Sequence, residues 1–211
     1  MDKIICVGKN YAEHAAELGD AIPEKPVIFI KPPSTLRLGS TSESPLELSL
    51  PLHSADIHHE VELVFRIDRD GYKMSLEEAE EALGAVTVGL DMTLRDLQSD
   101  AKKKGGPWTI GKVFRDAAVI GPWIESSDFP KTMNQEFTLT INGVRKQCGR
   151  AKQMSHSPAA CLAYVSQFFP ICRGDILFTG TPAGVGPVTV GQTATLSFAT
   201  INYSVIWTSR V

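Results

Sequence analysis

Three acidic side chains, Glu60, Glu62 and Asp91, have the types and the positions to bind a divalent cation. Glu60 and Glu62 are two residues apart in the segment 58–67, which alternates as a β-strand does, so both carboxylates lie on one face. Such a pair alone is typical of a solvated strand face. Asp91, however, follows the apolar segment 85–90, where a buried carboxylate requires a cationic partner. Oxygen ligands without a thiolate favour Mg²⁺ or Mn²⁺, with Ca²⁺ as a substitute, over zinc.

Four further side chains could meet a negatively charged substrate at this metal. Arg95 and Gln98 are four and seven residues beyond Asp91, so on a following helix they share a face that can turn toward the metal. Residues of these types on an amphipathic helix usually face solvent, and it is their register with Asp91 that favours the site. Lys31 and Lys112 each follow apolar residues, which can lead an amine into a pocket. Either lysine could therefore balance the charge of an enolate.

His14 and Glu17 form a candidate acid–base pair, because they are three residues apart on an expected helix that opens at Asn10. Glu17 can orient the imidazole and stabilise its protonated form while His14 acts as a base. By itself such a pair is more often without function. The glycine-rich segment 180–186 lacks the lysine of a phosphate loop and the spacing of a dinucleotide-binding turn, which favours a tight turn beside the substrate.

The elements that must position these residues are mostly strands. Strand signals, including an Asn142-Gly143 hairpin turn, outnumber helix signals, and strands and helices do not alternate regularly. This pattern predicts a β-rich α+β fold rather than a doubly wound sheet. We expect helices near 10–17, 76–83, 93–104 and 158–169, and strands near 4–7, 27–30, 58–67, 85–90, 118–120, 137–141, 176–179, 194–198 and 203–207, with turns and short strands over 34–54.

Composition limits the class of protein. The 211 residues, 43% of them apolar, predict a single domain spanning 1–211. A net charge of -3 argues against a nucleic-acid partner, and the one basic run, 102–104, is interpreted as a solvated helix end. The four cysteines show neither zinc spacing nor a disulfide framework. No segment has the length of a signal peptide or membrane span, so we expect a cytoplasmic protein without a membrane partner.

Six motifs occur together along nearly the whole chain, and in this order they resemble the fumarylacetoacetate hydrolase family. The length resembles the short single-domain branch of acylpyruvases and oxaloacetate decarboxylases. The motifs are Gly8-Lys9-Asn10-Tyr11 with His14 and Glu17, Phe29-Ile30-Lys31-Pro32, Glu60-x-Glu62, Asp91 with Arg95 and Gln98, Gly111-Lys112, and Gly180-Thr181-Pro182-x-Gly184-Val185-Gly186.

The resemblance implies a barrel-like roll of mixed β-sheet, usually as a homodimer, with the three acidic residues above at the metal-ligand positions. It implies that His14 and Glu17 are a catalytic dyad on a lid helix, within the first twenty or so residues, that orders over bound substrate. It also implies a substrate pocket, with Lys112 favoured over the other lysine as the catalytic one. The implied pocket residues are Lys31, Arg95, Gln98, Lys112 and Thr181. Lys9 departs from the arginine that relatives often carry, which weakens any bidentate carboxylate contact there.

The expected function is therefore that of a metal-dependent hydrolase or lyase. It would cleave the C3–C4 bond of small 2-oxo acids, by acylpyruvate hydrolysis or oxaloacetate decarboxylation, through a pyruvate enolate whose charge the metal stabilises. The first alternative is an oxaloacetate keto-enol tautomerase, or an isomerase or hydratase of 2-hydroxyhepta-2,4-diene-1,7-dioate, which needs only proton relocation. A remote alternative is a non-catalytic binding protein whose acidic cluster holds a stabilising ion.

Overall fold

The described residues form three β-sheets, and the largest of them has eight strands. The structure is a computed structural model that describes residues 1–17, 19, 21–42 and 44–210. The largest sheet has the order β2-β1-β13-β6-β7-β9-β3, and β10 pairs with β7. Its strands, in that order, are β2 (Val27–Lys31), β1 (Ile4–Gly8), β13 (Ile176–Phe178), β6 (Val61–Ile67), β7 (Leu83–Asp91), β9 (Ala118–Ile120), β3 (Leu36–Leu38) and β10 (Ile124–Glu125).

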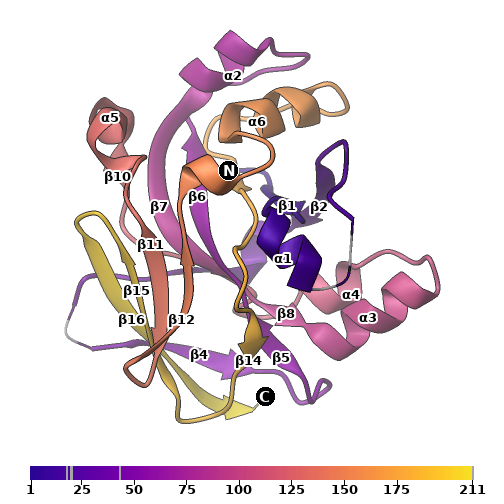
Figure 1. Cartoon of the computed structure of the whole chain (residues 1–211), viewed down its shortest axis with the longest axis vertical. Coiled ribbons are helices and arrows are strands. Elements are labelled where there is room, and N and C mark those ends of the chain that lie inside the picture. Colours follow the sequence, from indigo (N-terminus) through magenta and orange to yellow (C-terminus); the bar gives the residue numbers. More distant parts are fainter. Residues whose placement is uncertain (18, 20, 43, 211) are drawn as a thin grey trace.

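Strands β6 and β7 form the curved centre of this sheet (Figure 1). All nine residues of β7 are buried, because both faces of the sheet are covered. The period of two along β6 separates its side chains, so that Leu63 and Phe65 join the larger apolar core while Val64 joins a smaller one on the opposite face. The predicted alternation is therefore present along β6, but the single strand expected over 58–67 is interrupted at Glu60, and Ile57–His59 pairs in a different sheet.

A second sheet, with the order β12-β11-β15-β16-β4, covers the larger core. Its inward residues, among them Phe137, Leu196 and Trp207, belong to the same apolar cluster as Leu63 and Phe65, and burial of this surface is the main driving force for the arrangement. Its strands are β12 (Val144–Gly149), β11 (Phe137–Ile141), β15 (Thr193–Phe198), β16 (Ile201–Arg210) and β4 (Leu46–Leu50).

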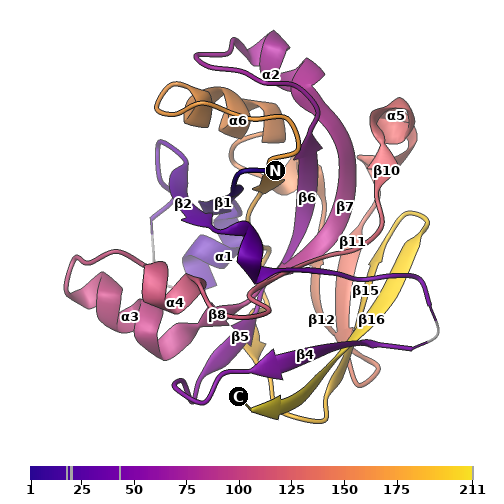
Figure 2. The same ribbon diagram turned by 180° about the vertical axis from the view of Figure 1, so that it is seen from behind.

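A small sheet and six short α-helices complete the described part of the chain. Helices α3 and α4 lie on one side of the molecule and the second sheet on the other, as Figure 2 shows from behind. Among the described residues, no helix is long and apolar enough to span a membrane. The small sheet joins β14 (Gly186–Pro187), β5 (Ile57–His59) and β8 (Thr93–Leu94); the helices are α1 (Ala12–Glu17), α2 (Leu76–Ala82), α3 (Arg95–Lys103), α4 (Thr109–Lys112), α5 (Phe129–Thr132) and α6 (Pro158–Ser166); 3₁₀ turns span Pro33–Thr35, Ser126–Asp128 and Ala151–Gln153.

The predicted β-rich α+β fold with few short helices is confirmed, with local differences at helix ends. The helix expected over 93–104 begins at Arg95, because Thr93 and Leu94 pair with β5 instead. The helix expected over 158–169 ends at Ser166. Helix α4, which the sequence analysis did not predict, closes against α3 and brings Lys112 toward the ends of β6 and β7.

Candidate metal centre and active site

The three predicted carboxylates meet at one point in the structure. Glu60 precedes β6, Glu62 lies within it, and Asp91 ends β7, so the antiparallel pairing of these strands, which aligns Val61 with Leu90, brings the three side chains together. One ligand oxygen from each acidic residue lies within 4.8 Å of the others. Exposed fractions of 5% or less show that this negative charge is buried and requires compensation.

Two cations on the helices supply part of that compensation. The Lys112 ammonium donates to Glu60 Oε2 at 2.8 Å, to Asp91 Oδ2 at 2.7 Å and to Thr93 Oγ1 at 2.7 Å. The Arg95 guanidinium donates to Glu60 Oε1 at 2.6 Å. Glu60 is therefore held in an ionic network that orients its carboxylate.

Lys31 is placed differently from the expectation that it lines the substrate pocket. Its buried ammonium donates to the carbonyl oxygens of Met92 and Ala117 at 3.0 and 2.6 Å, and lies 2.6 Å from Asp91 Oδ1. These contacts direct the amine at Asp91, and Lys31 is absent from the described pocket lining. Its position fits a role in holding Asp91 in place rather than in contacting substrate.

Asp91 Oδ1 and the Glu62 carboxylate are less fully hydrogen-bonded than the Glu60 carboxylate. The Lys31 ion pair does not have hydrogen-bond geometry, so Asp91 Oδ1 is a buried oxygen without a hydrogen-bond donor among the described residues. Glu62 Oε2 accepts a bond from the backbone N–H of Gly180 at 2.6 Å. A hard divalent ion coordinated by Asp91 and Glu62 would supply the positive charge that these two carboxylates need in a buried site. The donor set thus fits a divalent metal.

The pKa values of Glu60 and Glu62 are shifted in opposite directions. Burial raises the pKa of Glu60, but the nearby Lys112 and Arg95 cations outweigh burial and hold that pKa below its ordinary value. Burial, reinforced by the Asp91 and Glu60 carboxylates, raises the pKa of Glu62 well above its ordinary value. Because metal ligands must be deprotonated, a cation and a proton compete for Glu62.

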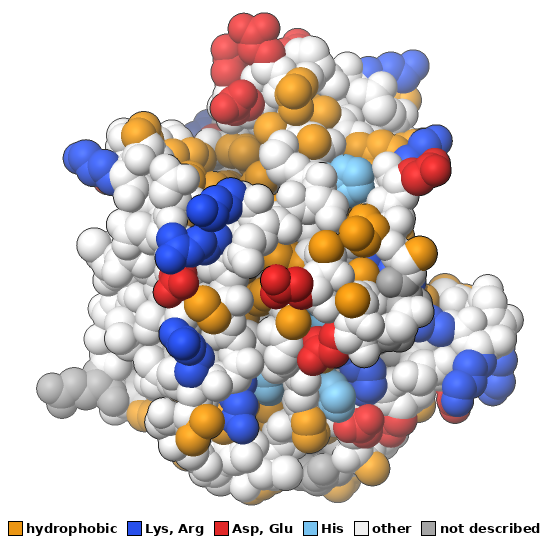
Figure 3. Space-filling model, in the orientation of Figure 1, with side chains coloured by type: hydrophobic (Ala, Val, Ile, Leu, Met, Phe, Trp, Pro, Cys, Tyr) orange, Lys and Arg blue, Asp and Glu red, His pale blue; other side chains and the backbone are white. Residues whose placement is uncertain are grey.

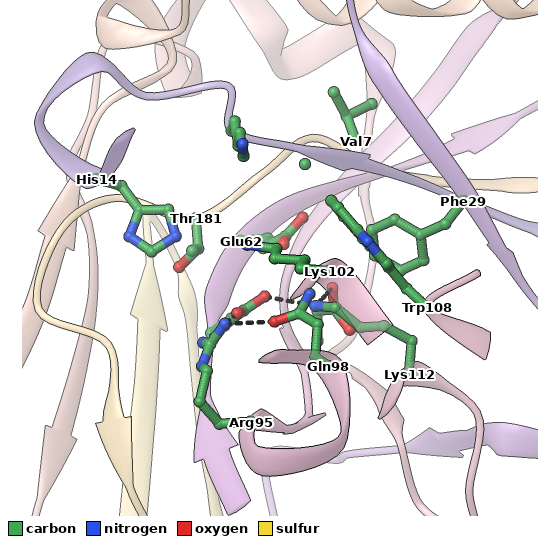
Figure 4. A pocket seen from close by; sticks show the side chains of 14 residues that line it. Val7, His14, Phe29, Glu62, Arg95, Gln98, Lys102, Trp108, Lys112 and Thr181 are labelled. Carbon is green, nitrogen blue, oxygen red and sulfur yellow. Dashed lines mark hydrogen bonds and ion pairs between the residues drawn. The ribbon is translucent and has the colours of Figure 1, made fainter. Parts of the chain in front are cut away.

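The three carboxylates line a small pocket, together with residues from α1, α3 and α4 and from the glycine-rich segment 180–186. Figure 4 shows His14 and Thr181 on one side of it and Arg95, Gln98 and Lys112 on the other. Arg95 Nη1 also donates to Gln98 Oε1 at 2.7 Å, as their positions on one helix face predicted. All of the expected site residues therefore line this pocket, except Lys31 and Glu17.

Glu17 lies behind His14, where it can orient the imidazole. His14 Nδ1 is 3.2 Å from Glu17 Oε2, and the Gly184 N–H donates to both Glu17 oxygens at 3.2 Å. His14 is buried while Glu17 is exposed. Helix α1 is thus tied to the glycine-rich loop, and His14 Nε2 remains directed away from its glutamate partner.

Gln147 is a supporting residue that the sequence analysis did not identify. Its Oε1 accepts from the Val61 N–H at 3.0 Å and lies 2.9 Å from His59 Nδ1, while its Nε2 donates to Thr181 Oγ1 at 2.8 Å. Thr181 in turn donates to the Val61 carbonyl at 2.8 Å. These bonds clamp the backbone between the two glutamates. No local pattern on β12 signals this role, because the contact spans 86 residues.

Six other residues that line the pocket were not predicted as site residues: Phe29, Lys102 and Trp108, and Val7, Gly8 and Lys9 around the end of β1. The two rings lie against each other, with centroids 5.8 Å apart. Lys102 had been interpreted as part of a solvated helix end, yet it lies seven residues beyond Arg95, a spacing that returns to the same helix face. That spacing was the signal that could have identified it.

The fold and the site define a β-rich α+β protein with a buried carboxylate centre suited to a divalent cation. The chain belongs to the fumarylacetoacetate hydrolase family, because residues 3–202 match the family model described as Fumarylacetoacetate (FAA) hydrolase C-terminal. The resemblance predicted from the six motifs is thereby confirmed.

Individual relatives cover most of the chain. It is 37% identical to oxaloacetate tautomerase YcgM of Escherichia coli over 94% of this chain and 89% of that protein. It is 42% identical to a mitochondrial oxaloacetate decarboxylase of Dictyostelium discoideum, over 90% and 85% of the two chains. A fumarylpyruvate hydrolase from Pseudomonas aeruginosa, solved in complex with Mn²⁺ and pyruvate, superposes with a TM-score of 0.94 at 37% identity, covering 100% of this chain and 91% of that one.

Proposed function

We propose that this protein is a divalent-metal-dependent enzyme that cleaves the C3–C4 bond of small 2-oxo acids, as acylpyruvate hydrolase, oxaloacetate decarboxylase or both. The observation that carries this proposal is the buried carboxylate triad in a pocket that is also lined by His14, Arg95 and Lys112. The relatives named as an oxaloacetate decarboxylase and a fumarylpyruvate hydrolase support it.

The charges of the site match such a substrate. Glu60, Glu62 and Asp91 supply three negative charges when ionised, and Lys31, Arg95 and Lys112 supply three positive charges in contact with them. Mg²⁺ or Mn²⁺ would therefore leave an excess of two positive charges among these groups, without counting Lys9 and Lys102, which also line the pocket. A carboxylate together with an enolate oxygen carries the complementary two negative charges, which favours this ligand in a buried site.

Each protein group then has a proposed role. Glu60, Glu62 and Asp91 would hold the metal, which when bound supplies Lewis-acid polarisation of the 2-oxo group. Arg95 and Gln98 bind and orient the C1 carboxylate. Lys112 places positive charge beside the enolate oxygen.

The proposed proton transfer begins at His14, which Glu17 orients. His14 takes a proton from a water molecule that attacks the distal carbonyl of an acylpyruvate. The C3–C4 bond breaks, its electron pair remains on C3 as pyruvate enolate, and the attacked fragment leaves as a carboxylic acid. Oxaloacetate reaches the same enolate by losing CO₂.

A tautomerase is the second candidate, because the relative with 37% identity over 94% of this chain is named an oxaloacetate tautomerase. Keto-enol exchange requires only proton transfer at C3 and no bond cleavage, and His14 is placed to carry that proton. The two candidates share the metal and the carboxylate-binding residues. Product analysis distinguishes them.

The deciding experiment follows pyruvate release from acetylpyruvate and from oxaloacetate. Purified protein is stripped with a chelator and resupplied with Mg²⁺ or Mn²⁺, with metal alone as the control for uncatalysed decarboxylation. Metal-restored release above that control supports cleavage. Loss of the ultraviolet absorbance of enol oxaloacetate without pyruvate release would instead support the tautomerase, and retained activity in Glu60→Ala would exclude this site.

A further inference from the structure

Lys102 is the one member of the basic run 102–104 that lines the described pocket. It is half-buried, whereas Lys103 and Lys104 are exposed at the end of α3. Figure 3 shows lysine and arginine side chains gathered on the exposed end of this helix. The three neighbouring lysines therefore have different environments, and only the first has access to a ligand held at the carboxylates.

The helix places Lys102 in line with the residues proposed to bind the first carboxylate. Arg95, Gln98 and Lys102 follow a spacing of three and four residues, so they lie on one face and all line the pocket. Lys102 is roughly 6 Å beyond Gln98 along the axis, at a rise of about 1.5 Å per residue. Long side chains on a helix lean toward its N-terminus, which directs Lys102 back toward Gln98 and the pocket.

The Lys102 ammonium lies beside a pair of aromatic rings. Lys102 Nζ is 5.2 Å from the centroid of the Trp108 ring, which lies against Phe29. Lys112 Nζ is 4.8 Å from the centroid of the Phe29 ring. Figure 4 draws both lysines and both rings among the side chains that line the pocket. Of the cations that line the described pocket, Lys112 and Arg95 contact the metal-ligand carboxylates, Lys102 lies one turn of helix beyond Gln98, and Lys9 follows β1.

We propose that Lys102 determines specificity by binding a second carboxylate, so that the preferred substrates are 2-oxo acids with a carboxylate at each end of a chain of four or five carbons. This inference rests on the proposed function for the position of the first carboxylate. With the 2-oxo acid end at Arg95 and Gln98, the distal end reaches one helical turn further, where Lys102 supplies the opposite charge. The Trp108 and Phe29 rings border the carbon chain between the two ends.

Binding measurements test this proposal directly. Isothermal titration of the Mg²⁺-loaded protein with pyruvate and with 2-oxoglutarate compares ligands with one and two carboxylates. The wild type is expected to bind 2-oxoglutarate more tightly. Lys102→Met keeps the aliphatic stem, and should weaken 2-oxoglutarate by about tenfold and pyruvate by less than about threefold, as expected for loss of one charge-assisted hydrogen bond. Lys102→Arg should restore most of the preference, and the matched variant Lys103→Met should change neither affinity.

Turnover gives a second readout. Lys102→Met should raise the KM for oxaloacetate with little change in kcat, and leave acetylpyruvate, which has no distal carboxylate, almost unaffected. Equal losses for both ligands, no loss for either, or a wild type that prefers pyruvate would overturn the assignment. If the wild type releases no pyruvate from either substrate but retains a Lys102-dependent preference for 2-oxoglutarate, the proposed cleavage reaction fails while the carboxylate site stands.

Discussion

At the scale of single residues, Glu62 is the side chain best suited to separate metal binding from folding. Glu60 and Asp91 are bonded to buried cations, so removing either leaves a buried charge without its partner, which costs on the order of 3–5 kcal/mol. Glu62 instead accepts its bond from the neutral N–H of Gly180. A change at Glu62 therefore perturbs the ionic network least.

Glu62→Gln should weaken Mn²⁺ binding by about 10- to 100-fold or more. Losses of about that size follow when a residue that only hydrogen-bonds to a metal ligand is removed, and Glu62 is proposed to be a ligand itself. The metal-free protein should keep its thermal stability, because burial already disfavours the charged form of Glu62, whose pKa is raised by burial and by Asp91 and Glu60. Isothermal titration with Mn²⁺ and a melting curve check both expectations. Unchanged Mn²⁺ affinity would remove Glu62 from the ligand set.

His14→Ala is the complementary change, because His14 lines the pocket without belonging to the carboxylate triad. It should lower turnover by about 10²- to 10⁴-fold, the usual contribution of a general base, while Mn²⁺ affinity stays within experimental error. Steady-state kinetics and the same titration measure the two quantities. Equal losses of metal and of activity would show that His14 acts on the metal centre itself.

At the scale of elements, the position of Lys112 depends on how closely α4 approaches α3. A Cβ added at Gly111 would lie 2.8 Å from the backbone nitrogen of Gln98, closer than real Cβ contacts allow, whereas one at Gly106 would meet only the Ala101 carbonyl oxygen, at 3.7 Å. Gly111→Ala must therefore separate the helices. It should destabilise the protein by about 1–3 kcal/mol, as other overpacking changes do. Activity should fall with the displacement of Lys112.

Gly106→Ala is the matched control for Gly111→Ala, and should change stability by less than about 0.5 kcal/mol. Urea unfolding of the two variants provides the comparison. Equal stability of both would mean that the contact between α3 and α4 does not constrain Lys112.

The start of β1 is held by Asp175, which precedes β13 and accepts from the Asp2 and Lys3 N–H groups at 2.9 and 3.0 Å and from the Lys3 ammonium at 2.8 Å. Burial raises the pKa of Asp175, but the Lys3 ammonium and backbone donors outweigh it and lower that pKa below its ordinary value. A lowered folded pKa adds stability above the ordinary value, and that stability is lost as the pH falls through the folded pKa.

Asp175→Asn should therefore cost about 2–3 kcal/mol at neutral pH, the size of hydrogen bonds to a charged group. The difference from the wild type should shrink as the pH falls below about 4, the range of an ordinary aspartate. Chemical unfolding at a series of pH values measures it. A difference that stays constant down to acid pH would assign the loss to packing rather than to charge.

At the scale of the whole molecule, the carboxylates are carried by the two central strands of the largest sheet, so occupancy of the site is coupled to global stability. A ligand that binds only the folded state stabilises it by about 2.7 kcal/mol at a concentration of 100 times Kd. For a chain of this size that corresponds to a rise in Tm of roughly 5–10 °C.

We therefore expect Mg²⁺ and Mn²⁺ to raise the Tm of chelator-treated protein in a concentration-dependent manner, measured by differential scanning calorimetry. The rise should be much smaller in Glu62→Gln at the same concentrations. An equal rise in both proteins would indicate that the stabilising ion binds elsewhere. Removing the metal with chelator should reverse the rise and abolish turnover together.

The sequence by itself determined those features that depend on local periodicity. The period of two expected over 58–67 placed Glu60 and Glu62 on one face, and the helical period placed Arg95 beside Gln98, to which it donates a hydrogen bond of 2.7 Å. The apolar segment before Asp91 predicted a buried strand end. These inferences hold because neighbouring residues on a regular element have nearly the same relative positions in any fold.

Only the tertiary structure decided which distant groups meet. The pairing of β6 with β7 sets Asp91 beside Glu60, and a shift of one residue would turn the side chains of one strand to the opposite face. Lys31 is directed at Asp91 rather than into the pocket. Gln147 accepts a hydrogen bond from Val61 in β6, 86 residues away in the sequence. Strand register and the approach of helices to a sheet follow from packing of the whole core, so local sequence patterns do not predict them.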